Sequence, residues 1–278
     1  MGLVTAKEVA QAINLAKYGV FGTFIGWILL KVTRISSINS FYDSIAHLEG
    51  EAYADAILEH FEIDYKLPEE DLKRLPKEGP YVTISNHPLG AIDGILLFKL
   101  MLRQRPDFKI MANFLLQRMV PLKPYIIPVN PFTDRKESQS SIGGFKNTLQ
   151  HLQNGHVLGV FPAGEVSTSK EGKLVVDKPW EEAALKLIRK AEVPVVPIYF
   201  HAKNSPLFYR FAKLGDSIRT AMIPSQVFSQ SNRPIKVRIG QPIAISTQKE
   251  QETLEEFTDL LRRKVYILSN AYQKERLI

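Results

Sequence analysis

The chain has 278 residues, of which 45% are hydrophobic, enough to bury the core of one large domain with an appended segment. It contains no cysteine, so disulfides and thiolate catalysis are excluded. The formal net charge of +7 is spread along the sequence, which favours anionic membranes or acidic carrier proteins as partners. Nucleic acid is the weakest candidate, because no zinc-finger spacing or aromatic-rich basic motif accompanies the charge.

Residues 1–64 are predicted to be helical, with a first helix through Lys31 and a second from about Ser40 to Phe61. Apolar side chains recur every three to four residues along the second helix: Phe41, Ile45, Leu48, Ala52, Ala56, Ile57 and Phe61. We expect residues 1–64 to form a two-helix segment that faces a membrane, and residues 65–278 to form a separate α/β domain.

The first helix contains an apolar run from Gly19 to Leu30, bracketed by Lys17, Lys31 and Arg34. As a helix this run would extend ~18 Å at ~1.5 Å per residue, which is shorter than the bilayer core of about 30 Å. Trp27 and the flanking cations are typical of a helix that lies in the membrane interface. The alternative is a helix buried against the protein core.

From Pro80 onward, runs rich in β-branched residues alternate with helical runs. The predicted strands are Tyr81–Ser85, Lys109–Ala112, Tyr125–Val129, Val157–Phe161, Val195–Phe200 and Ile235–Ile239. The predicted helices between them are Gly94–Arg103, Ser140–Leu152 and Trp180–Ala191. This alternation predicts a mixed α/β fold whose largely parallel sheet is flanked by helices.

The C-terminal part is predicted to end in an amphipathic helix. Thr247 to Glu250 matches a capping box, which would open that helix. Its apolar face is formed by Leu254, Phe257, Leu261, Val265 and Leu268. Such a face packs on the core more often than on a partner.

The stretch from Asn86 to Gly94 contains the residues of a general base. His87 follows a predicted strand, and Asp93 comes six positions later at the start of a helical run. Pro88 and Gly90 predict a tight turn that folds the carboxylate back toward the imidazole. The carboxylate would fix the tautomer, and the other ring nitrogen would then take a proton from a hydroxyl or an amine. The alternative is a helix start capped by Asp93.

Four blocks of the sequence resemble the motifs of the glycerolipid acyltransferases, the family of lysophosphatidic acid acyltransferases. They stand in the family's order: Asn86-His87 with Asp93, Pro124–Asn130, Val160–Ser167 and Val195–Ile198. The third block resembles the family's Phe-Pro-Glu-Gly-Thr-Arg-Ser pattern. The resemblance spans residues 80–200 and does not include the N-terminal segment.

The blocks also depart from the family's pattern. Five residues, rather than the usual four, lie between the histidine and the aspartate. Ala163 and Val166 stand where the third block usually has Glu and Arg, and Asn130-Pro131 stands where the second usually has Arg. In the family those residues hold the glycerol phosphate of the acceptor. The sequence is more similar to the hemolysin-like branch that acylates the amine of an amino acid such as glycine or ornithine.

The resemblance implies a catalytic pair of His87 and Asp93. No Gly-x-Ser-x-Gly elbow and no cysteine is present, so we expect direct attack by the acceptor without an acyl-enzyme. Candidate substrate-binding residues come from the motif blocks: Asn86, Asn130, Arg135, Phe161, Pro162, Gly164, Glu165 and Ser167. Backbone N–H groups near Gly164 would face the oxyanion, unless this is only a turn. Glu165 would attract an acceptor ammonium, unless it is a solvated charge.

Cations in or after the motif loops are candidates for contact with coenzyme A phosphates or acyl carrier protein: Arg135, Lys136, Lys170, Lys173, Lys203 and Arg210. The histidines have no metal-site spacing, so we expect no metal and no cofactor beyond an acyl thioester co-substrate. Together these features predict a monotopic acyltransferase of membrane lipid biosynthesis on the cytoplasmic face of a membrane. Its acyl donor is acyl carrier protein or acyl-CoA, and its acceptor is an amino-acid amine or a lysoglycerophospholipid. A non-catalytic, membrane-associated lipid-binding protein is the alternative.

Overall fold

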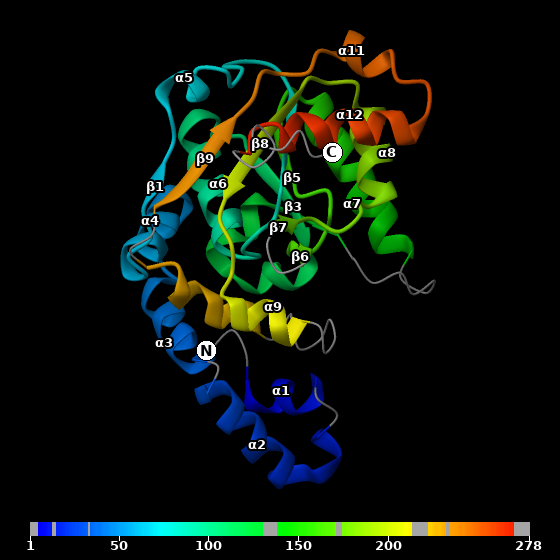
Figure 1. The fold of residues 1–278 in the computed structure, drawn as a ribbon. Coiled ribbons are helices and arrows are strands. Elements are labelled where there is room, and N and C mark those ends of the chain that lie inside the picture. The colour runs from blue at the N-terminus through cyan, green and yellow to red at the C-terminus, as the bar shows by residue number, and fades with distance from the viewer. Residues whose placement is uncertain are drawn as a thin grey trace.

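The computed structural model describes residues 5–12, 15–32, 34–129, 138–170, 174–212, 222–231 and 234–269. Its centre is a seven-stranded sheet in the order β1-β9-β8-β2-β5-β3-β4, with helices on both faces (Figure 1). The strands of this sheet are β1 (Tyr65–Lys66), β2 (Tyr81–Ser85), β3 (Lys109–Asn113), β4 (Ile126–Val129), β5 (Val157–Val160), β8 (Val195–His201) and β9 (Ile235–Ile239). Strands β6 (Thr168–Lys170) and β7 (Leu174–Val176) form a separate antiparallel hairpin.

The helices follow the predicted alternation with the strands. They are α1 (Ala6–Ala12), α2 (Gly19–Val32), α3 (Ile35–Ile45), α4 (Gly50–His60), α5 (Glu69–Leu72), α6 (Ile92–Gln104), α7 (Ser138–Gln153), α8 (Glu182–Ala191), α9 (Pro206–Ala212), α11 (Ile245–Lys249) and α12 (Leu254–Tyr266). Short 3₁₀ helices are η1 (Ala16–Tyr18), η2 (Phe114–Arg118), η3 (Val120–Tyr125) and η5 (Val227–Ser229).

Five neighbouring strands, β8, β2, β5, β3 and β4, run parallel to one another. Strand β9 is antiparallel to β8, and β1 is parallel to β9 at the edge. The predicted mixed fold with a largely parallel sheet is therefore confirmed. Because β2, β5 and β8 are parallel neighbours, their carboxyl ends meet at one edge of the sheet, where the segments after Ser85 and Val160 leave it.

The central strand β2 is buried on both faces along its whole length, although its sequence includes the polar residues Thr83 and Ser85. Tyr81 packs in a cluster with side chains of α4 and α6 on one face. Val82 and Ile84 pack in a second cluster with side chains of α8 and α12 on the other face. These two apolar layers hold the carboxyl end of β2 in place, and the first sequence motif begins there.

The N-terminal helices differ from the prediction. The expected single helix from Ser40 to Phe61 is wrong, because α3 and α4 are separated by residues 46–49 and Gly50 has a left-handed φ of +56°. Tyr53 and Leu58 of α4 are buried in the core beside α6. The division into a segment of residues 1–64 and a domain of residues 65–278 stays a prediction.

The expected first helix through Lys31 is also divided, into α1 and α2. These helices pack against each other at the end of the molecule below α9 in Figure 1. A Cβ on Gly26 would overlap the carbonyl oxygen of Ala6, so a glycine is needed at this close approach. Among the described residues, no single helix is long and apolar enough to cross a membrane. By length and composition, α2 and α3 together meet that criterion, with a 75° bend between them.

The C-terminal capping box lies six residues later than predicted. Thr247 is inside α11, and the box is formed by Thr253 and Glu256, whose side chains bond to each other's backbone N–H groups. The expected apolar face does pack inward, because Phe257, Leu261 and Val265 are buried beside α8. Two Thr-x-x-Glu patterns stand close together at this point of the sequence, and the helix begins at the one that immediately precedes the apolar stripe.

Two adjacent glycines in α7 allow a test of how α7 packs on β4. A Cβ on Gly143 would meet nothing within 4 Å, whereas a Cβ on Gly144 would lie 2.7 Å from the backbone carbonyl oxygen of Pro128 in β4. We expect Gly143→Ala to raise the free energy of unfolding by roughly 0.5–1 kcal/mol through helix propensity. We expect Gly144→Ala to lower it by roughly 1–3 kcal/mol, because backbone must move. Urea unfolding of both variants measures the difference, and equal effects would contradict the packing of α7 on β4.

Candidate active site

His87 and Asp93 are brought together by the turn between β2 and α6. The Nδ1 atom of His87 lies 3.1 Å from Oδ2 of Asp93, which stands in the first turn of α6. Backbone N–H groups also hold the carboxylate: Leu89 and Gly90 donate to Oδ2 at 2.9 and 3.3 Å, and Gly94 donates to Oδ1 at 2.9 Å. The predicted fold-back of the carboxylate onto the imidazole is therefore present in the structure.

The pair is shielded from water, since the side chain of Asp93 is 0% exposed and that of His87 is 16% exposed. Nδ1 and Oδ2 lie within ion-pairing distance, and the two side chains carry opposite charges only when the imidazole is protonated. Burial alone would lower the pKa of His87, but attraction to Asp93, and more weakly to Asp177, outweighs it and raises that pKa above its ordinary value. His87 is thus a strengthened base whose Nε2 is not engaged by Asp93.

The aromatic ring of Phe161 fixes the plane of the imidazole. Phe161 directly follows β5, and its ring stacks on that of His87 with centroids 4.1 Å apart and an interplanar angle of 27°. The parallel pairing of β2 with β5 brings the two residues to the same edge of the sheet. The stacked ring covers one face of the imidazole, so approach from that side is blocked.

Asn86 ties the ends of two parallel strands together. Its Nδ2 donates to the carbonyl oxygen of Phe200 at 3.0 Å, and the N–H of Phe200 donates to its Oδ1 at 2.7 Å. The side chain is 4% exposed. These bonds extend the pairing of β2 with β8 by one more residue, and they place Asn86 as a support for the backbone before His87.

The third block forms a turn beside the pair. Gly164 has a left-handed φ of +64°, and its N–H donates to the carbonyl oxygen of Phe161 at 2.9 Å. The carbonyl oxygen of Pro162 accepts from the N–H of Glu181 at 2.8 Å. Oε2 of Glu165 lies 2.9 Å from Nζ of Lys178. Lys178 therefore offsets the negative charge that was predicted to attract an ammonium.

Ser167 and Asp177 hold the main chain of His87. The N–H of Ser167 donates to the carbonyl oxygen of His87 at 2.8 Å, and its Oγ donates to Oδ1 of Asp177 at 2.6 Å. The same Oδ1 accepts from the backbone N–H of His87 at 3.1 Å. Asp177 was missed in the sequence analysis, because it follows a short apolar run and belongs to no recognised spacing.

Asn204 was also missed, and it supports the turn from the other side. Its Nδ2 donates to the carbonyl oxygen of Pro88 at 3.1 Å, and its side chain is 2% exposed. It follows β8, the strand to which Asn86 is bonded. Its only sequence signal is its place after the predicted strand Val195–Phe200.

Several predicted residues cannot be placed. Asn130, Arg135, Lys136 and Lys173 lie outside the described residues, as does the side chain of Lys170. Lys203 and Arg210 are exposed, after β8 and on α9 respectively. Within the described residues, no group of three or more His, Asp or Glu side chains is arranged to hold a metal ion.

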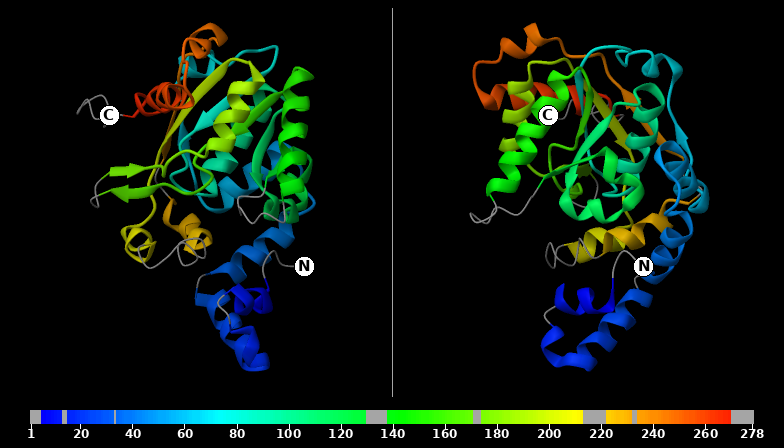
Figure 2. Two further views of the ribbon diagram at one scale, coloured as in Figure 1. Left: turned by 90° about the vertical axis from the view of Figure 1, so that its right-hand side faces the viewer. Right: turned by 180° about the vertical axis from the view of Figure 1, so that it is seen from behind.

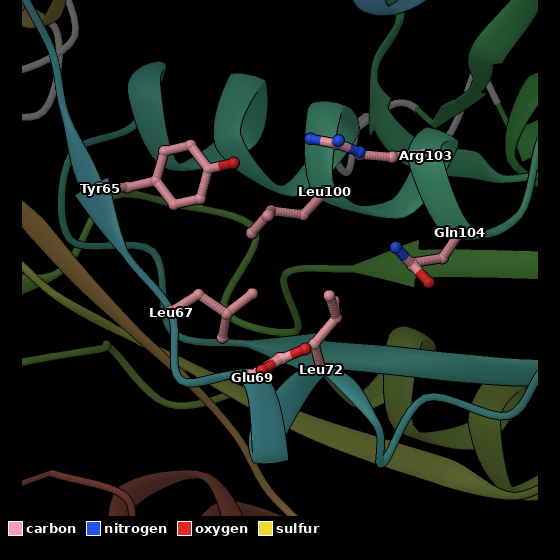
Figure 3. Close-up of a pocket in the computed structure, with 7 residues that line it drawn as sticks. All are labelled: Tyr65, Leu67, Glu69, Leu72, Leu100, Arg103 and Gln104. Atoms are coloured by element: carbon pink, nitrogen blue, oxygen red, sulfur yellow. The ribbon is translucent and has the colours of Figure 1, made fainter.

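A cavity of about 330 Å³ lies away from the His87–Asp93 pair (Figure 3). Its lining residues are Tyr65, Leu67, Glu69, Leu72, Leu100, Arg103 and Gln104. The last three stand at the end of α6, and Asp93 stands at its start. Asp93 precedes Leu100 and Gln104 by ~10–17 Å along the helix at ~1.5 Å per residue, so the cavity and the His87–Asp93 pair are separate features.

Comparison with known proteins identifies the family of the chain. A profile of the protein family described as "Acyltransferase" matches residues 8–275. The lyso-glycine lipid O-acyltransferase of Bacteroides thetaiotaomicron is 27% identical over 275 residues, which cover 96% of this chain and 97% of that protein. The enzyme of the same name from Phocaeicola vulgatus is 25% identical over 273 residues, which cover 96% of this chain and 95% of that protein.

A solved structure shares the fold. The crystal structure of the 1-acyl-sn-glycerophosphate acyltransferase PlsC from Thermotoga maritima has a TM-score of 0.51 at 15% identity, covering 96% of this chain and 95% of that one. The chain therefore belongs to the acyltransferase family, and the predicted resemblance to the glycerolipid acyltransferases is confirmed. It is an enzyme, so the non-catalytic alternative is set aside.

The His87–Asp93 pair generates a prediction for acyl transfer. We expect His87→Ala to lower turnover ~10²–10⁴-fold in a folded protein, because a general base is lost. In the wild type, kcat/KM should fall with decreasing pH around an inflection above that of a free histidine, since protonated His87 is inactive and its pKa is raised. Asp93→Asn should cost less and move the inflection to lower pH.

The matched control is His156→Ala, which removes a histidine bonded to Asp107 instead of Asp93. We expect this variant to keep wild-type turnover. Acyl thioester cleavage, measured as thiol release across pH for all four proteins, gives the comparison. Wild-type turnover in folded His87→Ala protein would contradict the role of this base.

Proposed function

We propose that the protein transfers a fatty acyl group from a thioester to a hydroxyl of a lyso amino-acid lipid in membrane lipid biosynthesis. The buried His87–Asp93 pair carries this proposal, because its raised basicity suits proton removal from a hydroxyl. The names of the two similar enzymes support the acceptor, since both are lyso-glycine lipid O-acyltransferases. O-acyl transfer requires a hydroxyl nucleophile.

The reaction balances without a covalent enzyme intermediate. Nε2 of His87 takes the hydroxyl proton as the acceptor oxygen bonds to the thioester carbonyl carbon. The tetrahedral intermediate then breaks its C–S bond, and the leaving thiolate takes the proton from the imidazolium. Asp93 favours the imidazolium during this sequence through its negative charge beside Nδ1.

The residues of the third block support an acceptor without a phosphate. Val166 and Ala163 stand where the family usually has Arg and Glu, and they are only 4% and 2% exposed. A phosphomonoester needs fixed cations, preferably a forked arginine, and these two buried apolar side chains provide none. Lys178 pairs with Glu165, and its positive charge weakens the attraction of that carboxylate for an acceptor ammonium. Both points favour the hydroxyl of an amino-acid lipid over an amine or a lysophosphatidate.

Exposed apolar side chains on α2 support attachment to a membrane. Phe21 is 64% exposed, Phe24 55% and Trp27 46%. Nζ of Lys31 lies 4.1 Å from the ring centroid of Trp27, as expected for an interfacial aromatic with a neighbouring cation. Because α1 and α2 lie together at one end of the molecule (Figure 2), this surface would meet the bilayer first. We place it on the cytoplasmic face, with acyl carrier protein or acyl-CoA as donor.

An acceptor panel tests the proposed function. Purified protein is given one acyl-CoA or acyl carrier protein thioester with a lyso-glycine lipid, with free glycine or ornithine, or with lysophosphatidate. We expect acylation of the lyso-glycine lipid only, and a product cleaved by mild alkali, because an ester forms and not an amide. His87→Ala is the inactive control. Acylation of lysophosphatidate alone, or an alkali-stable product, would refute the proposed acceptor.

Vesicle flotation tests the membrane surface. We expect wild-type protein to float with anionic phospholipid vesicles and to bind less in 1 M salt, where screening shortens to ~3 Å. Replacing Phe21, Phe24 and Trp27 together by Ser should release it, because interfacial binding scales with buried apolar area. The matched control is Ile267→Ser, which removes an apolar side chain of 47% exposure just after α12. Equal flotation of the two variants would show that α2 is not the docking surface.

A further inference from the structure

A second buried carboxylate, Asp177, lies beside the main chain of His87. Asp177 is 3% exposed and directly follows β7. Its Oδ1 accepts from the N–H of His87 at 3.1 Å and from Oγ of Ser167 at 2.6 Å. Its Oδ2 accepts from Nε1 of Trp180 at 3.2 Å. These three donors are neutral, so they solvate the negative charge without cancelling it.

Ser167 completes a clamp on His87. Its N–H donates to the carbonyl oxygen of His87, so both peptide groups of the base are bound by the Ser167–Asp177 pair. The β6–β7 hairpin joins these two residues and extends away from the sheet (Figure 2). The bond between Oγ of Ser167 and Oδ1 of Asp177 therefore closes the base of that hairpin against the active site.

Helix α12 fixes Asp177 from the other side. The N–H of Asp177 donates to the hydroxyl of Tyr266 at 2.8 Å, and Nη2 of Arg262 donates to its carbonyl oxygen at 3.0 Å. Nη1 of Arg262 donates to the next carbonyl oxygen, that of Lys178, at 3.2 Å. The guanidinium thus holds the backbone, and the carboxylate remains directed to His87, Ser167 and Trp180.

We propose that Asp177 is a positioning residue for the general base: it fixes the main chain of His87 and adds a negative charge that stabilises the imidazolium during acyl transfer. This proposal rests on the proposed function of His87. A buried charge acts strongly on a neighbouring group because little water screens it. Burial lowers the pKa of His87, whereas the negative charges of Asp93 and Asp177 both raise it.

Titratable and charged groups face His87 and Asp177 from several elements. They are Asp93 on α6, Tyr199 on β8, Tyr209 on α9, Arg262 and Tyr266 on α12, and the Glu165–Lys178 pair. Burial raises the pKa of Tyr199 and of Tyr209 to about 12, and it raises the pKa of Tyr266 further. These phenols stay neutral near pH 7, so a titration there reports His87 and not a tyrosine.

The test compares two substitutions that each remove one negative charge. Asp177→Asn keeps an oxygen for the N–H of His87, and the control Asp107→Asn changes a carboxylate that precedes β3 and is bonded to Arg105. Asp107 lies at the edge where the parallel strands begin, ~16 Å along the five-residue β2 from His87. At 0.1 M salt the screening length is ~10 Å, so this control charge barely reaches the imidazole.

Two readouts are measured on the full-length protein. The first is the NMR titration of the six histidines, with the His87 signal assigned by its loss in His87→Ala. The second is the pH profile of kcat/KM for acyl transfer. We expect Asp177→Asn to lower the pKa of His87, to shift the acid inflection to lower pH and to reduce kcat about 10- to 100-fold. Asp107→Asn should leave the His87 titration and the pH profile as in the wild type, although it changes the partner of His156.

Ser167→Ala tests the clamp with the charge retained. We expect kcat to fall about 10-fold with KM and the pKa of His87 near their wild-type values, because only the hold on the main chain is weakened. If Asp177→Asn does not fold, Asp177→Ser carries the same expectation for the pKa. An unchanged pKa in the neutral variants, or an unchanged kcat in Ser167→Ala, overturns the proposal. Wild-type activity that survives His87→Ala would instead refute the proposed function.

Discussion

The carboxylate of Asp93 is wholly buried at the start of α6, and the geometry of the site is built around it. Moving an isolated carboxylate out of water costs several kcal/mol, so the surrounding groups must compensate for the lost hydration. The N–H groups of Leu89, Gly90 and Gly94 do so, together with the imidazole of His87. One buried charge therefore connects the turn, the start of the helix and the imidazole of His87.

Much of this arrangement is local in the sequence, and that is why it was predictable. His87 and Asp93 are six residues apart, with the turn-forming Pro88 and Gly90 between them, so one short stretch contains both partners and their connection. The alternation of strands and helices likewise predicts the parallel sheet that places Phe161 beside His87. The order of the strands within the sheet, which makes β2 and β5 neighbours, was not predicted.

The parts that were not predicted depend on non-local packing. Asp177 reaches His87 only because the β6–β7 hairpin returns to the site and α12 holds its end, and no spacing in the sequence encodes that return. Both Thr-x-x-Glu patterns before α12 match a capping box as short motifs. Thr253 caps the helix because packing of Phe257 on α8 decides where the helix begins. The break between α3 and α4 before Gly50 was not predicted either, because the apolar spacing of a helix continues across it.

Two departures from the family's pattern are physically connected. The turn after His87 contains one residue more than usual, and Gly90 takes a left-handed φ of +82° within it. A Cβ on Gly90 would overlap the side chain of Val166, so the longer turn packs directly on the position where the resembled motif has an arginine. Val166 is 4% exposed there, and a guanidinium in its place would be buried without water. The turn after His87 and the side chain of Val166 are thus in direct contact, so the conformation of the turn and the apolar residue at position 166 depend on each other.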